Sequence, residues 1–187
     1  MGYTLRIGKK SIDNDYKKVL FKEYLDDGYE LEYAEKQSIL FATCVKLENH
    51  ENAPAFGEPT DYENARWPSY SAWAVFCEIT EINFLFYENI NGVNNFKGGH
   101  PGYFYITKEW LSDLNHFIKR FRNKYPNCIA SYSTDIDSYD TKISYQKYSK
   151  KTEQMPVNFM LCRLEWLEYW CNYAVEKYGE EAIFTNS

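Results

Sequence analysis

Residues 56–78 read FGEPTDYENARWPSYSAWAVFCE and change halfway from a polar, proline-punctuated loop to an apolar helix. Pro59 and Pro68 each fix φ, lack a backbone N–H and disfavour the α conformation in the residue before them. The first half of the stretch therefore cannot be regular structure throughout. Ser69 stands where its hydroxyl can accept a hydrogen bond from the first turn of the following helix. We expect the rest of the chain to be organised around this loop and helix.

A second loop of similar character, GGHPGYFYIT at residues 98–107, leads into the next helix. Both loops mix aromatic rings with hydrogen-bonding groups, and binding residues are frequent on loops that a rigid scaffold holds. We expect the two loops to converge on one binding site. The predicted site residues are Asp61, Asn64, Arg66, Trp67, Ser69, Tyr70, His100 and Tyr103.

The chemistry of these side chains predicts a ligand that is small, flat and polar, such as a nucleotide. Trp67 and Tyr70 would stack on the ligand, while Arg66 and His100 would meet its negative charge. Two structural alternatives stay open. Arg66 can pack over Trp67 as a cation–π pair, and His100 can be an exposed residue of a turn.

Two other functions compete with simple binding. In the binding hypothesis, Asp61 and Asn64 take hydroxyl groups or base edges of the ligand. In the first alternative, the protein is instead a hydrolase or transferase. His100 then acts as general acid or base with Asp61 or Glu63. In the second, the protein inhibits a host protein through the tyrosine-rich segment 132–148, because tyrosine is enriched at interface hot spots.

No established catalytic or metal motif accompanies these residues. The chain contains no HExxH, zinc-finger spacing, Walker loop or GxSxG elbow. The run from Asp135 to Asp140 resembles a calcium loop, but it lacks the glycine at loop position 6 and has Gln146 in place of the final glutamate. The sequence therefore predicts no metal and no cofactor.

Composition limits the class of protein further. The chain of 187 residues suits one globular domain over residues 1–187, and 18 Tyr, 12 Phe and 5 Trp supply many stacking faces. A net charge of −6 argues against general nucleic-acid binding, which needs clustered cations. Five cysteines without CxxC spacing and no apolar run of membrane-spanning length favour a reduced, cytoplasmic protein. Oligomeric state is left open.

Hydrophobic periodicity predicts an α+β fold, mostly helical with a small β-sheet. Strands are expected at 3–7 and 39–47, where apolar residues alternate along the chain. Loops with one short hairpin are expected over 127–155. Helices are expected at 11–25 with Asp13 or Asn14 as N-cap, from Ser69 onward, from Thr107 to about Tyr125, and from Pro156 to Tyr178.

Three segments carry a resemblance of layout to a known group of proteins. They are MGYTLRIG at residues 1–8, AFGEPTDYENARWPSYSAWAVFC at 55–77 and GGHPGYFYITKEWL at 98–111. Over about its first two-thirds, the chain resembles a family of small uncharacterised accessory proteins encoded by bacteriophages and prophages. The resemblance implies an accessory protein that is expressed early in the cytoplasm of a bacterial host. By analogy with other small phage proteins, it could evade host defence, for example by sequestering a nucleotide second messenger.

Overall fold

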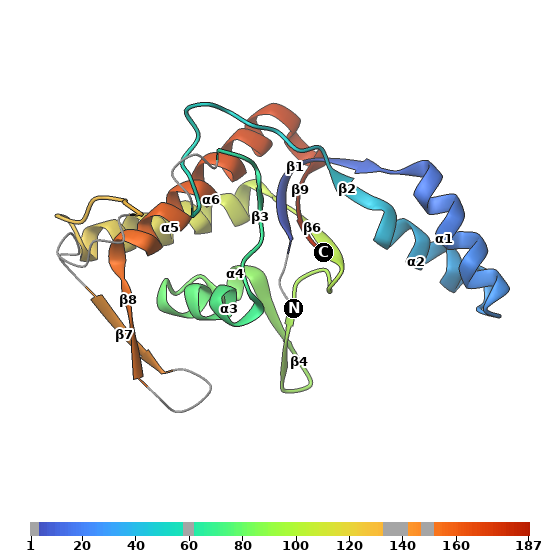
Figure 1. Cartoon of the computed structure of the whole chain (residues 1–187), viewed down its shortest axis with the longest axis horizontal. Coiled ribbons are helices and arrows are strands. Elements are labelled where there is room, and N and C mark those ends of the chain that lie inside the picture. The colour runs from blue at the N-terminus through green and yellow to red at the C-terminus, as the bar shows by residue number, and fades with distance from the viewer. Residues whose placement is uncertain (1–3, 58–61, 133–141, 147–151) are drawn as a thin grey trace.

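The first and last strands of the chain lie side by side at the centre of the main sheet in the computed structural model (Figure 1). β1 (Leu5–Ile12) pairs antiparallel with β9 (Ala182–Asn186), and backbone hydrogen bonds between Thr4 and Ser187 extend this ladder. Thr4 and Ser187, the first and last described residues, are thereby held together at one end of the sheet. The structure describes residues 4–57, 62–132, 142–146 and 152–187.

The remaining strands of this sheet flank the central pair, in the order β2–β1–β9–β6, and β3 also pairs with β1. Their bounds are Thr43–Val45 for β2, Ala65–Arg66 for β3 and Gly102–Tyr105 for β6. Residues directly opposite one another in antiparallel strands share a face. Arg66, Leu5, Asn186 and Gly102 therefore form one row across the sheet, which joins the loop after β3 to the loop before β6.

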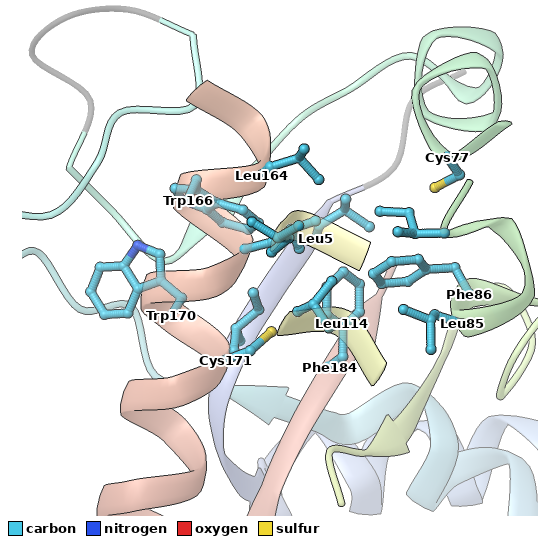
Figure 2. Packing of buried hydrophobic residues seen from close by; sticks show 14 of the residues in the cluster. Leu5, Cys77, Leu85, Phe86, Leu114, Leu164, Trp166, Trp170, Cys171 and Phe184 are labelled. Carbon is cyan, nitrogen blue, oxygen red and sulfur yellow. The ribbon is translucent and has the colours of Figure 1, made fainter. Parts of the chain in front are cut away.

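One face of the sheet is covered by helices. α6 (Val157–Tyr178) packs on β1 and β9, and α5 (Lys108–Lys124) packs against α6. α3 (Tyr70–Ile79) and the short α4 (Asn83–Phe86) contribute to the same core. Figure 2 shows its centre, where aromatic and aliphatic side chains from all these elements meet, among them Leu5, Phe86, Leu114, Trp166 and Phe184.

A two-helix hairpin extends away from the sheet on the side opposite α5 and α6 (Figure 1). It consists of α1 (Asn14–Asp26) and α2 (Leu31–Ala42), which pack against each other. No residue of α1 is buried. Val19 and Leu31 are 54% and 65% exposed, so the hairpin presents apolar side chains to solvent.

Two small hairpins and one short helix complete the described structure. β4 (Tyr87–Ile90) and β5 (Val93–Phe96) are joined by Asn91 and Gly92, whose φ angles of 52° and 83° suit a tight hairpin turn. β7 (Lys142–Gln146) pairs with β8 (Thr152–Pro156), within the segment where a hairpin was expected. A 3₁₀ turn at Gly179–Glu181 links α6 to β9.

The predicted α+β fold, mostly helical with a small antiparallel sheet, is confirmed. Three predicted N-caps are also confirmed, because Asp13, Ser69 and Thr107 each accept a backbone hydrogen bond from the first turn of their helix. The helix expected from Pro156 to Tyr178 is α6, which has Pro156 as its N-cap and ends at Gly179, a residue with positive φ.

The predicted strand at 39–47 is wrong for most of its length. α2 continues through Ala42, and only Thr43–Val45 is extended. The buried residues Ala34, Ser38 and Ala42 recur every fourth position, which is the spacing of a helix face. Large apolar residues do alternate in this segment, but α2 packs against α1 and buries one helical face, which favours the helix.

Candidate functional site

The two predicted loops make contact through Tyr70 and His100. Their ring centroids are 5.4 Å apart and the ring planes are nearly perpendicular. His100 Nδ1 lies 3.0 Å from Oδ1 of Asn186, whose Nδ2 donates to the Gly99 carbonyl at 3.2 Å. Since the amide orientation is set by that second bond, Oδ1 accepts from Nδ1–H of the histidine. In the neutral form of the ring, Nε2 is then a hydrogen-bond acceptor.

The glycines around His100 allow the loop to fold this tightly. Gly98 has a φ of 78°, and a Cβ added there would lie 2.1 Å from the Tyr103 carbonyl oxygen. A Cβ on Gly102 would lie 1.9 Å from the Gly98 carbonyl oxygen. Only glycine fits at both positions. The loop thus places the imidazole beside the first turn of α3.

Arg66 and Trp67 do not lie together, although the sequence analysis paired them. Arg66 is the last residue of β3, and Trp67 is the first residue beyond it. Arg66 is 4% exposed, and its Cζ lies 5.5 Å from the ring centroid of Trp166, whereas Trp67 is 76% exposed. The indole next to Arg66 in the structure is that of α6. Of the predicted pair, Trp67 is the residue whose side chain a ligand in solvent can reach.

Two further predicted site residues hold the backbone. Asn64 is fully buried, and its Nδ2 donates to the carbonyl oxygens of Ile7 and Lys46 at 2.7 and 3.1 Å. Its Oδ1 accepts from the Glu48 amide at 3.0 Å. Ser69 Oγ accepts from the amide of Ala72 as the N-cap of α3. These hydrogen bonds explain the positions of both side chains, so neither residue needs a ligand as a partner.

Tyr103 lies on the other face of the sheet from the core. Phe104 stacks on the core residue Phe184, with ring centroids 5.3 Å apart. Neighbouring residues of a strand point to opposite faces, so Tyr103 and Tyr105 point away from the core. Lys10 Nζ donates to both phenol oxygens at 2.8 Å. Three predictions fall on residues that the structure does not describe: Asp61, the calcium-loop-like run 135–140 and most of the segment 132–148. Among the predicted residues, the structure therefore brings Tyr70 and His100 into contact.

A dense polar cluster was not predicted. Glu48 accepts hydrogen bonds from the hydroxyls of Tyr173 (2.8 Å) and Tyr178, and Lys177 Nζ lies 3.5 Å from its Oε2. His50 Nε2 is 3.3 Å from the same oxygen. Burial raises the pKa of Glu48, but the tyrosine bonds and the Lys177 charge outweigh it and lower the pKa overall. The carboxylate is thereby kept ionised.

A weak sequence signal for this cluster existed. Tyr169 and Tyr173 are four residues apart in a predicted helix, which places them on one face. Glu48 and His50 alternate in an extended segment and so share a side. Nothing in the sequence joins the two pairs, because more than a hundred residues separate them.

Metal and thiol chemistry find little support in the described part of the chain. There, no group of three or more His, Cys, Asp and Glu side chains is placed to hold a metal ion. Burial raises the pKa of the Cys162 thiol to about 12, and Cys77 and Cys171 are also buried. Cysteines of this kind are poor nucleophiles. Within the same residues, no helix is both long and apolar enough to cross a bilayer.

Comparison of the chain with protein-family models, with curated proteins and with solved structures finds no match.

Proposed function

We propose that this protein binds a small, flat, polar ligand and releases it unchanged. The observation that carries the proposal is the contact of the Tyr70 ring with His100, which joins two loops far apart in the sequence. Trp67, three residues before Tyr70, adds an exposed indole to the same loop. Aromatic faces together with a histidine nitrogen suit a heterocycle, which needs both stacking and hydrogen bonds at its edge.

The exposure of Trp67 supports a role in binding. The other four tryptophans, Trp73, Trp110, Trp166 and Trp170, are at most 9% exposed, whereas Trp67 is 76% exposed. An indole in water forgoes the favourable burial that its large apolar surface offers. A ligand that stacks on the ring would recover part of that free energy.

The partner of His100 differs from that of the histidine in a Ser-His-Asp hydrolase. In that triad a carboxylate holds the histidine and stabilises the imidazolium that forms during the reaction. Here the amide of Asn186 lies at hydrogen-bond distance from the ring. An amide orients the ring but supplies no negative charge, so the arrangement does not match the Ser-His-Asp triad. The resemblance to phage accessory proteins extends the proposal to a nucleotide second messenger, sequestered in the cytoplasm of a bacterial host.

Trp67→Ala is expected to weaken nucleotide binding by about 5- to 150-fold, because stacking of one base on an aromatic ring contributes about 1–3 kcal/mol. Isothermal titration with cyclic dinucleotides, ADP-ribose and mononucleotides measures the effect. Trp67 should also dominate iodide quenching of the protein's fluorescence, and a bound nucleotide should protect it.

Ile129→Ala is the matched control, because Ile129 is 78% exposed and is equally an apolar side chain in solvent. Both variants should melt within a few degrees of the wild type. The proposal fails if no nucleotide of the series binds, or if Trp67→Ala binds as tightly as Ile129→Ala. A hydrolase would instead return altered nucleotide after incubation and denaturation.

A second candidate function, inhibition of a host protein, is favoured by the α1–α2 hairpin. Tyr16, Val19 and Leu31 are each about half exposed or more on this projecting element. Val19→Ser/Leu31→Ser is expected to reduce capture of a specific host protein at least tenfold, with an unchanged melting temperature. Capture that is unaffected would exclude the hairpin as the interface. Chromatography with light scattering separates this outcome from self-association of the hairpin.

A further inference from the structure

A groove with a volume of 480 Å³ lies along α6. One wall is a stripe of that helix at three- and four-residue spacing, namely Glu165, Glu168, Tyr169, Asn172, Tyr173 and Glu176. Residues at this spacing share one helix face, and eleven steps of 1.5 Å extend it over about 16 Å. Arg122 of α5 and Pro54 lie on the other side. The groove is long enough for an extended ligand.

Two parallel tyrosine rings form the middle of the groove. The ring planes of Tyr169 and Tyr173 differ by 4°, with centroids 6.5 Å apart. The hydroxyl of Tyr169 lies 3.0 Å from His50 Nδ1, and that of Tyr173 donates to Glu48 at 2.8 Å. The polar cluster behind the groove therefore fixes both rings. Rings held in this way contribute contact surface without losing rotational freedom on binding.

The charge of the groove is negative. Three glutamates line it with a single arginine. Arg122 donates to both oxygens of Glu168, at 3.1 and 2.8 Å, and to Glu165 at 3.4 Å. Glu176 is exposed at the other end of the stripe. The groove thus disfavours phosphates and attracts cations.

The structure already shows how an ammonium group interacts here. Lys177 Nζ lies 4.7 Å from the centroid of the Tyr173 ring and 3.5 Å from Glu48 Oε2. One protonated amine is therefore bound by a ring face and a carboxylate in the cluster that adjoins the groove. At the Glu168 end of the groove, Arg122 forms an ion pair with Glu168.

We propose that this groove is a second binding site, for an extended organic cation of the alkylamine class. The ring faces of Tyr169 and Tyr173 would contact the methylene chain and its ammonium groups through cation–π interactions. Glu176 would pair with one terminal ammonium and Glu168, shared with Arg122, with the other. Glu168 and Glu176 are eight residues apart, about 12 Å along the helix axis, which an extended triamine can span.

Spermidine is the probe that tests the proposal, titrated calorimetrically into the full chain at constant ionic strength. Wild type is expected to bind it in one-to-one stoichiometry, and the uncharged 1,8-octanediol is expected not to bind. Glu176→Gln should weaken spermidine binding about three- to fivefold, the loss typical of one exposed ion pair. Tyr169→Leu, which removes a ring, should weaken it further.

Glu78→Gln is the control, because Glu78 is an exposed glutamate on α3 and its substitution changes the net charge equally. It should leave the affinity for spermidine within twofold of wild type. No binding of spermidine overturns the proposal. Equal weakening by Glu78→Gln and Glu176→Gln also overturns it, because attraction to the overall charge of the protein would then suffice.

Discussion

Phe184→Ala is expected to lower the free energy of unfolding by about 4 kcal/mol, among the larger losses for a buried phenylalanine. Phe184 lies in β9 between β1 and β6, and its side chain is fully buried. Its ring stacks on Phe104 and meets the edge of Phe86, with centroids 5.3 and 5.2 Å away. Figure 2 shows it at the centre of the packed cluster. A cavity there removes contacts from both the sheet and α4, and equilibrium urea denaturation measures the loss.

Phe84→Ala provides the matched control for that experiment. Phe84 is 47% exposed and contacts Phe117 on the surface of α5, so the same truncation should cost less than about 1 kcal/mol. The slope of unfolding against urea should be unchanged in both variants. If the two substitutions cost the same, Phe184 cannot occupy the core position described here.

The local features of the fold could be predicted from the sequence because short-range chemistry determines them. In a helix N-cap, one side-chain oxygen accepts a hydrogen bond from a backbone N–H two or three residues later. All the groups involved are close in the sequence, so the caps Asp13, Ser69 and Thr107 could be recognised there. The helix at 157–178 was recognisable from its apolar spacing and from Gly179, whose φ of 56° is costly for other residues.

The features that could not be predicted from the sequence are those that depend on contacts between distant parts of the chain. The segment at 39–47 has a strand-like pattern, but its first part belongs to α2. This helix packs against α1, and its buried residues Ala34, Ser38 and Ala42 recur at helical spacing. β3 has two residues, Ala65 and Arg66, and its pairing with β1 leaves both of them buried. Arg66 is therefore buried, and Trp67 beyond it is exposed. A one-residue shift of that register would exchange the two, which the sequence alone does not specify.

The meeting of Tyr70 and His100 also depends on the sheet. β3 leads into the loop of Trp67 and Tyr70, while β6 follows the loop of His100. Leu5 and Asn186, on the two central strands, complete the row between them. Asn186 also holds His100 directly through its side chain. The C-terminal strand, which the sequence analysis did not identify, is therefore the element that positions the proposed site.

Asn64→Ala is expected to lower the free energy of unfolding by about 3 kcal/mol, although Asn64 was predicted to touch a ligand. The substitution removes three hydrogen bonds, to the backbone of Ile7, Lys46 and Glu48, in a position without solvent exposure. A buried polar group that loses its partner costs about 1–3 kcal/mol. Asn64→Asp should be nearly as destabilising, because a carboxylate oxygen cannot donate to the carbonyls of Ile7 and Lys46.

Asn94→Ala is the control for this experiment. It tests whether the loss of any asparagine side chain destabilises the protein, or only the loss of the buried hydrogen bonds of Asn64. Asn94 is exposed on β5, and its side-chain bond to Asn89 is long, at 3.4 Å, so its loss should cost less than about 0.5 kcal/mol. Ligand affinity distinguishes the two roles of Asn64. If Asn64 only holds the backbone, Asn64→Ala should bind nucleotide as wild type does, once the unfolded fraction is taken into account. A stable Asn64→Ala variant with weakened binding would instead place this amide in the ligand site and refute its structural role.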